Sequence, residues 1–191
     1  MRAAVLQQEQ KNAQSPAAWR IAVNAVAFQA CWFGVVLLAS ANKPLLATAV
    51  GLATAALHLH LSQDRTREFS VMIATVLVGF IVEAILLGLG FVSYAFHKPI
   101  LFLPPAWLVA LWLAFGTLPN TSLEWLKRQP ALAAFLGALA GSISYYAAER
   151  LHAVTLAEPL WVTYTVISGL WAVTLALIMS VADRSNRSDR T

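Results

Sequence analysis

The sequence predicts an all-α fold, a polytopic transmembrane bundle of six helices with both termini in the cytoplasm. Hydrophobic residues make up 59% of the 191 residues and charged residues only 12%, against about 25% charged residues in soluble domains. Several apolar segments are also long enough to cross the roughly 30 Å hydrocarbon core of a bilayer. The predicted membrane-spanning helices are 19–40, 44–62, 71–92, 104–126, 131–150 and 159–181.

The two ends of the chain differ from this apolar part. Residues 1–18 are polar and show no hydrophobic period, so we expect a flexible cytoplasmic lead. Residues 182–191 are rich in Arg, Ser and Asp and are expected to form a disordered cytoplasmic tail. The domain between them, 19–181, holds all six helices. Its single cysteine, Cys31, excludes a disulfide framework or a cysteine metal site within one chain.

The first predicted helix, 19–40, carries two amide side chains, Asn24 and Gln29. The sequence Ala39-Ser40-Ala41 at its end fits a signal-peptidase site. The long polar lead before the helix and the two amides within it favour a retained helix. Whether the segment is ever cleaved stays open.

The second predicted helix, 44–62, ends with His58 and His60. On a helix, side chains at positions i and i+2 point about 200° apart, so these two rings cannot hold one metal ion without unwinding. We therefore expect two interfacial histidines, no metal site and no cofactor.

The third predicted helix, 71–92, is apolar except for Thr75 and Glu83. A charged side chain at the centre of a bilayer costs about 2.5–3.5 kcal/mol on insertion scales. Thr75, Gly79, Glu83 and Gly90 form one small and polar stripe, and such stripes face other helices rather than lipid. Glu83 is therefore expected to point into the bundle, where it needs a partner, a proton or water.

Three interpretations of Glu83 stay open. In the first, its carboxyl is protonated and donates a hydrogen bond to a carbonyl. In the second, it pairs with a basic group, for which Arg150 at the outer end of the fifth helix is the candidate. In the third, it binds substrate or relays protons. The cost of holding a carboxyl at this depth favours a functional role over packing alone.

The fourth predicted helix, 104–126, contains Pro119 in its second half. Proline lacks an N–H, so the carbonyl of Phe115 is expected to lose its helical partner at this point. Asn120 and Ser122 lie next to the freed carbonyl in the sequence. Such a group fits both a binding site and an ordinary kink whose polar atoms are satisfied locally.

The fifth predicted helix, 131–150, contains Gly137 and Gly141, a spacing that lets a neighbouring backbone approach closely. Ser142 follows, but the G-x-S-x-G arrangement of serine hydrolases is absent. Packing is therefore the expected role of this stretch.

Polar side chains predicted at membrane depth are the candidates for an internal polar cavity. Each of them has the alternative role of a hydrogen bond between helices, worth around 0.6 kcal/mol. The candidates are Glu83, Asn24, Gln29, Asn120, Ser122, Ser142, Tyr145, Tyr146, Glu149 and Arg150.

The basic residues predict the orientation in the membrane. Ten of the thirteen Lys and Arg residues fall in the lead, the tail and the loops near 63–68 and 127–130, and three fall in the opposite loops. Short cytoplasmic loops carry the excess of Lys and Arg, so both termini are expected inside. The net charge of +4 reflects this topology, and no nucleic-acid partner is expected.

Several motifs resemble those of one known family. They are Asn24-x-x-x-Phe28-Gln29-x-x-Trp32-Phe33, Pro105-Ala106-Trp107 with Leu111-Trp112, Ser122-Leu123-x-Trp125-Leu126 and Gly141-x-x-Ser144-Tyr145-Tyr146. From about Asn24 to Ala176 the chain is similar to a family of small six-span bacterial inner-membrane proteins known only as a domain of unknown function. The resemblance implies an acidic residue in the third span, usually Asp and here Glu83. Thr121 stands where the family often carries His.

The resemblance also implies a lipid-related role, because genes of this family often lie near genes of fatty-acyl-modifying enzymes. We therefore expect a bacterial inner-membrane protein whose polar interior, centred on Glu83, handles a lipid or lipid-like molecule as an accessory to acyl-chain modification. The expected partners are membrane lipids and lipid-modifying enzymes, and homo-oligomerisation stays open. A small proton- or substrate-coupled carrier and a non-catalytic membrane scaffold are the alternatives. The sequence assigns no enzymatic activity and favours a non-enzymatic role.

Overall fold

The computed structural model describes residues 18–97 and 102–188. Its helices are α2 (Ala18–Ser40), α3 (Pro44–Leu61), α4 (Arg65–Gly88), α5 (Ala106–Phe115), α6 (Pro130–Arg150) and α7 (Leu160–Ser188), with the 3-10 helix η1 (Glu124–Leu126). Two short strands, β1 (Val92–Tyr94) and β2 (Val154–Leu156), complete this part of the chain. All of these α-helices except α5 are long and apolar enough to cross a membrane. The predicted all-α bundle of six helices is confirmed.

Helix α4 is shifted toward the N-terminus relative to the predicted span. The carboxyl of Asp64 caps the helix by accepting a hydrogen bond from the N–H of Arg67 at 3.1 Å. The helix ends at Gly88, and Gly90 then takes a φ of +74°, which favours glycine. Glu83 therefore lies within the last two turns of α4, whereas it falls near the middle of the predicted span 71–92.

The predicted fourth span is not a single helix. Helix α5 ends at Phe115, and turns connect it to η1. The carbonyl of Phe115 accepts a hydrogen bond from the N–H of Leu118 at 3.0 Å, so the prediction of a freed carbonyl is wrong. Irregular backbone is tolerated at membrane depth only where protein or water covers it. Residues 116–120 are all buried, which meets that condition.

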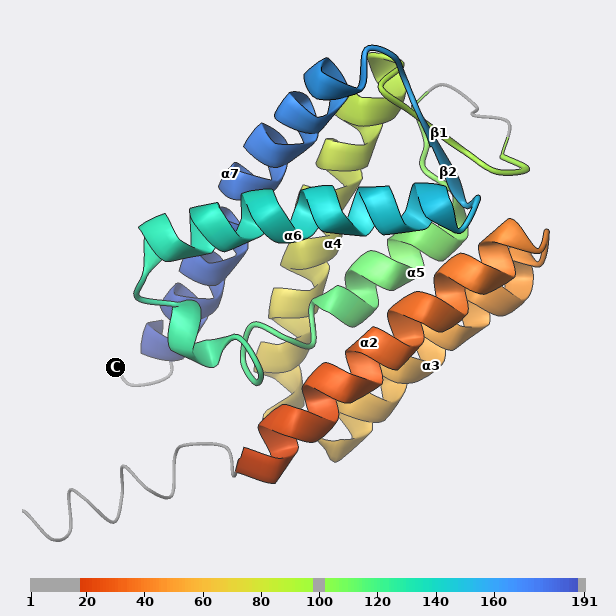
Figure 1. Cartoon of the computed structure of the whole chain (residues 1–191). Coiled ribbons are helices and arrows are strands. Elements are labelled where there is room, and N and C mark those ends of the chain that lie inside the picture. The colour runs from red at the N-terminus through yellow and green to blue at the C-terminus, as the bar shows by residue number, and fades with distance from the viewer. Residues whose placement is uncertain (1–17, 98–101, 189–191) are drawn as a thin grey trace, which may run out of the picture.

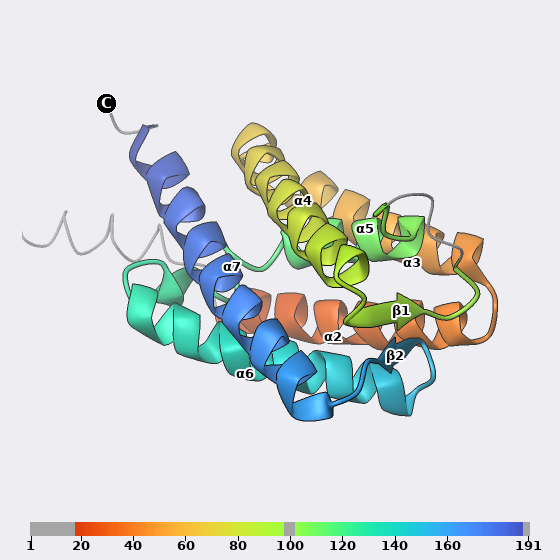
Figure 2. The same ribbon diagram turned by 90° about the horizontal axis from the view of Figure 1, so that it is seen from above.

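The segment from Phe102 to η1 runs along α4 in the opposite direction. Phe102 packs against Gly88 at one end of α4, and Asn120 approaches Arg67 at the other. Helix α2 packs on α3 and α5, helix α6 packs on α7, and α4 contacts both α5 and α7. Figures 1 and 2 show this arrangement.

The start of α2 and the end of α7 lie at the same end of the bundle (Figures 1 and 2). The hydroxyl of Ser122 donates to the carbonyl of Ile21 at 3.2 Å. Arg128 Nε lies 3.8 Å from Asp183 Oδ1. The loop between α5 and α6 therefore contacts both of these terminal regions.

Strands β1 and β2 pair in antiparallel register at the other end of the bundle, with Val92 opposite Leu156 and Tyr94 opposite Val154. Their outer residues are buried and their central residues exposed, as the alternation of a strand dictates. This pair was not predicted. It turns the chain back after α4 and places Tyr94 beside the helix it has just left.

The structure corrects the predicted start of the C-terminal tail. Helix α7 continues past residue 181 to Ser188, so the first part of the tail expected to be disordered is helical. The predicted lead, up to residue 17, and residues 189–191 lie outside the described residues.

Candidate functional site

The carboxyl of Glu83 is the centre of a buried hydrogen-bond cluster. Trp112 Nε1 on α5 donates to Oε1 at 3.0 Å. The Tyr145 hydroxyl on α6 lies 2.9 Å from Oε1 and 2.8 Å from Oε2, and the Tyr94 hydroxyl of β1 donates to Oε2. Only 2% of Glu83 is exposed. Side chains from four elements therefore meet at one carboxyl, and we call Glu83, Tyr94, Trp112 and Tyr145 the Glu83 cluster.

The partners of Glu83 are neutral hydrogen-bond donors. A carboxylate offers about four lone-pair positions on its two oxygens, so the three donor groups satisfy most of them. Arg150 is exposed at the end of α6, and none of the hydrogen bonds or ion pairs of Glu83 among the described residues involves a basic side chain. The interpretation that Arg150 pairs with Glu83 is wrong.

Two glycines position the aromatic rings beside this carboxyl. Trp112 on α5 and Trp171 on α7 stack with their ring centres 4.9 Å apart. A Cβ atom on Gly79 of α4 would lie 2.1 Å from Trp112 Cδ2, and one on Gly141 of α6 would lie 2.2 Å from Trp171 Cγ. The stacked indoles therefore fill a slot that exists only because both facing residues lack a side chain. The predicted packing role of Gly141 is confirmed.

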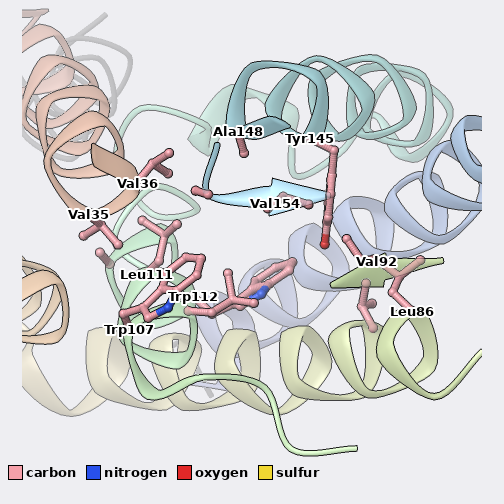
Figure 3. Close-up of a cluster of buried hydrophobic side chains, with 14 of the residues drawn as sticks. Val35, Val36, Leu86, Val92, Trp107, Leu111, Trp112, Tyr145, Ala148 and Val154 are labelled. Atoms are coloured by element: carbon pink, nitrogen blue, oxygen red, sulfur yellow. The ribbon is translucent and has the colours of Figure 1, made fainter. Parts of the chain in front are cut away.

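A cavity of about 670 Å³ adjoins the Glu83 cluster between α2 and α6. Its walls also include residues of α5 and α7, and most of the lining side chains are hydrophobic or aromatic. Glu83, Tyr94 and Tyr145 supply polar groups toward the β1–β2 end. Figure 3 shows Tyr145 extending from α6 past Val154 of β2 toward α4. This volume falls within the range of about 300–1,000 Å³ typical of ligand pockets.

The rim of the cavity carries exposed apolar side chains on both helices. Phe33 of α2 is 46% exposed, and Leu139 and Ile143 of α6 are 50% and 57% exposed; all three line the cavity. The lining residues of α6 extend from Leu136 to Ala148, a length of about 18 Å at 1.5 Å per residue. The cavity is therefore an elongated, mainly apolar space with an apolar rim.

Part of the predicted polar set lies at the cavity. Tyr145, Glu83, Gln29 and Ser122 line it. Asn24 is engaged at the end that carries the termini, where its Oδ1 accepts from the Ser122 hydroxyl and its Nδ2 lies 3.4 Å from the carbonyl of Thr117. These two residues join α2 to the irregular segment after α5.

The remaining predicted site residues lie outside the lining of the cavity. The hydroxyl of Ser142 bonds that of Ser168 at 2.6 Å between α6 and α7. Glu149 Oε1 accepts from the N–H of Leu156 at 3.1 Å and so holds β2. Tyr146 is 53% exposed. None of these lines the cavity. Asn120 accepts from Lys127 Nζ at 2.7 Å, away from the cavity lining.

The two histidines do not converge. His58 Nε2 lies 3.1 Å from Glu68 Oε2, which links α3 to α4, whereas His60 is exposed. Among the described residues there is no group of three or more His, Cys, Asp and Glu side chains able to hold a metal ion.

Two members of the Glu83 cluster, Tyr94 and Trp112, were not predicted. Tyr94 follows Glu83 by eleven residues, which on a continuous helix would put it about three turns away. The Gly88-Leu89-Gly90 stretch was the available signal, because glycine commonly ends a helix and lets the chain turn back. Trp112 belongs to a motif of the family resemblance, but its position in a segment rich in apolar residues gave no sign that its N–H meets a carboxyl.

Comparison with known proteins places the chain in a family. No curated protein and no solved structure matches it. The family model described as "Protein of unknown function (DUF2878)" matches residues 21–177, which is most of the chain and includes α3 to α6 in full. The chain therefore belongs to the DUF2878 family of proteins of unknown function.

Proposed function

We propose that this protein binds a long hydrocarbon chain, the fatty-acyl chain of a membrane lipid, in the cavity between α2 and α6. The observation that carries the proposal is the elongated apolar cavity with its exposed apolar rim at Phe33, Leu139 and Ile143. A void of this kind leaves its lining without contact partners on one side. An acyl chain supplies those contacts, whereas a polar solute does not.

The dimensions support a chain from one leaflet. The lining along α6 spans about 18 Å, close to half of a hydrocarbon core roughly 30 Å thick. The Glu83 cluster gives the cavity a polar region, and the oxygens of Tyr94 and Tyr145 retain acceptor capacity after donating to Glu83. A ligand with one polar group and a long apolar chain matches these walls.

Photo-crosslinking of the full chain in lipid nanodiscs tests this proposal. The probe is a phospholipid with a diazirine near the end of one acyl chain. We expect labelling of cavity residues such as Phe33 and Ile143. Ala140→Trp should suppress it, because Ala140 lines the cavity. Ala56→Trp, on the exposed surface of α3 and outside the cavity, is the matched control and should leave the labelling unchanged.

The opposite result is equally clear. Labelling confined to outward-facing residues such as Leu77 and Ile81 of α4, which are 61% and 59% exposed, would exclude an acyl chain from the cavity. Labelling of cavity residues that Ala140→Trp leaves intact would exclude the proposed location.

The Glu83 cluster favours a second candidate function, a non-catalytic scaffold. Its carboxyl joins α4, β1, α5 and α6 through three neutral donors, which is the arrangement of a packing element. Lipid mass spectrometry on a deletion strain, rescued with the natural protein or with Glu83→Leu, separates the two candidates. A changed lipid profile in the deletion strain supports lipid handling, and an unchanged profile in that strain supports the scaffold.

We further propose that the end carrying both termini faces the cytoplasm of a bacterial inner membrane and that the protein works beside lipid-modifying enzymes. The orientation is supported by the described basic residues: Arg20, Arg65, Arg67, Lys127, Arg128 and Arg184 lie at this end, and Lys43 and Arg150 at the other. The enzymatic partners rest on the family resemblance.

A further inference from the structure

A second buried polar cluster lies between the start of α4 and the irregular segment that follows α5. Lys127 Nζ donates to Asn120 Oδ1 at 2.7 Å, and Arg67 Nη2 approaches the same oxygen at 3.5 Å. Asn120 and Lys127 are each 7% exposed. Two cationic side chains therefore converge on a single neutral oxygen.

This cluster has more donors than acceptors. Arg67 Nε and Asn120 Nδ2 are buried and have no hydrogen-bond partner among the described residues. Turning the amide of Asn120 over would point its NH₂ group at the two cations, so the neighbours fix its orientation. Buried donors are normally satisfied, and these two belong to side chains that already meet at one oxygen.

The nearby carboxylates that the structure describes, including that of Glu124, lie beyond ion-pairing distance of the two cations. Neither Arg67 nor Lys127 forms an ion pair within the described part of the chain. Glu68 is engaged by His58 at 3.1 Å, and Asp183 lies 3.8 Å from Arg128.

Burial has the largest effect on the pKa of Lys127. Burial, together with the positive charge of nearby Arg67, lowers the pKa of Lys127 to about 8, although Glu124, Glu68 and Asp183 act in the opposite direction. A buried cation without a directly paired carboxylate is costly to hold, and Lys127 is such a cation. The two cations of the cluster therefore have no directly paired anion among the described residues.

We infer that Arg67, Lys127 and Asn120 form a binding site for a phosphate group, carried by an anionic phospholipid headgroup or by free phosphate. Several oxygens of one phosphate can accept from three separate donor groups, whereas a carboxylate offers only two oxygens. Arg67 also lies in the first turn of α4, where the helix dipole favours an anion. The inference goes beyond the proposed function, because none of these residues lines the cavity between α2 and α6.

Binding measurements on the detergent-purified full chain test this site. Isothermal titration with inorganic phosphate, with chloride as the control anion, reports free phosphate. Native mass spectrometry of retained phosphatidylglycerol against phosphatidylcholine reports a headgroup. We expect binding in at least one arm and a loss of about tenfold or more in Lys127→Gln and Arg67→Gln, the scale of a lost charge-assisted contact. Arg128→Gln is the matched control, because this neighbouring side chain is 77% exposed, and it should bind as the natural protein does.

The two arms identify the source of the phosphate. Binding of inorganic phosphate without preference for phosphatidylglycerol indicates the free anion, and the reverse indicates the lipid headgroup. Binding in neither arm overturns the inference. Equal losses in Lys127→Gln and Arg128→Gln also overturn it, since general charge would then explain the binding. Ala140→Trp should leave this binding unchanged, which separates failure of this site from failure of the acyl-chain proposal.

A second variant keeps the test decisive if the cationic substitutions fail to fold. Asn120→Asp supplies the missing anion from within the chain. We expect its thermal midpoint without phosphate to exceed that of the natural protein, and phosphate to raise that midpoint no further. A lower midpoint for Asn120→Asp, or an undiminished response to phosphate, would show that the cluster has no need of an anion.

Discussion

Replacing Glu83 with leucine removes the acceptor that joins four elements of the fold. Tyr94, Tyr145 and Trp112 would each lose their acceptor on this carboxyl. The two tyrosine hydroxyls already lie 3.5 Å apart, so one can donate to the other, and two donors remain unpaired. Each buried unpaired donor costs about 1–3 kcal/mol, which gives a loss of roughly 2–6 kcal/mol.

Removal of a buried carboxyl offsets part of this loss. Burying a carboxyl group costs free energy in either protonation state, and leucine carries no polar group. We therefore expect Glu83→Leu to destabilise the protein by about 2 kcal/mol, near the lower limit of the range for the unpaired donors. For a chain of this size that corresponds to a fall of roughly 4–8 °C in the melting temperature. Glu83→Gln keeps one acceptor oxygen and should lose only about 1 kcal/mol.

Thermal unfolding of the detergent-solubilised protein, followed by circular dichroism, measures these differences. A double-mutant cycle of Glu83→Gln with Tyr145→Phe should show a coupling energy of at least about 0.5 kcal/mol, as expected for residues in contact. If Glu83→Leu melts at or above the temperature of the natural protein, the hydrogen bonds to Glu83 do not hold the four elements together.

Three further predictions concern other parts of the molecule. Gly79→Ala should destabilise the protein by about 1–3 kcal/mol through overpacking, because the new Cβ atom would lie 2.1 Å from Trp112 Cδ2. The control Gly169→Ala on α7 has open space around it and should not destabilise the protein. Equal melting temperatures for the two variants would show that the stacked indoles do not depend on the missing side chain of Gly79. Burial lowers the pKa of Lys127 from 10.5 to about 8, so the unfolded chain binds more protons between these values and stability should rise with pH across them. Lys127→Gln should lose that rise in thermal unfolding, and a rise of the same size in the variant would contradict the assignment. In a cysteine-free background, a cysteine replacing Arg128 should react with an impermeant thiol reagent only from the cytoplasmic side, and one replacing Lys43 only from outside; the reverse labelling would invert the proposed orientation.

The long helices could be predicted from the sequence because their physics is local. Hydrophobic length alone placed α2, α3 and α6 within a residue or two of their observed ends. Helix α4 begins earlier than predicted because Asp64 caps a polar first turn that hydropathy does not count. The predicted fourth span contained Gly116 and Pro119, and the structure ends α5 just before them, where neither residue favours a continuing helix.

The composition of the site depended on contacts that sequence periodicity does not encode. Glu83 and Tyr145 were predicted to lie in the interior, and the structure brings them together. Tyr94 reaches the same carboxyl only because β1 pairs with β2, and Tyr94 and its partner Val154 are 60 positions apart in the chain. Three-residue strands leave too little pattern to predict such a pair. The cavity itself arises from the spacing of α2 and α6, a tertiary property with no local signal.

A high-resolution structure of the full chain in lipid nanodiscs tests the central claim most directly. The acyl-chain proposal predicts continuous, chain-like density that enters between Phe33 and Ile143 and extends toward Tyr145. Ordered water filling this space, or direct packing of α2 on α6 along it, would contradict the proposal.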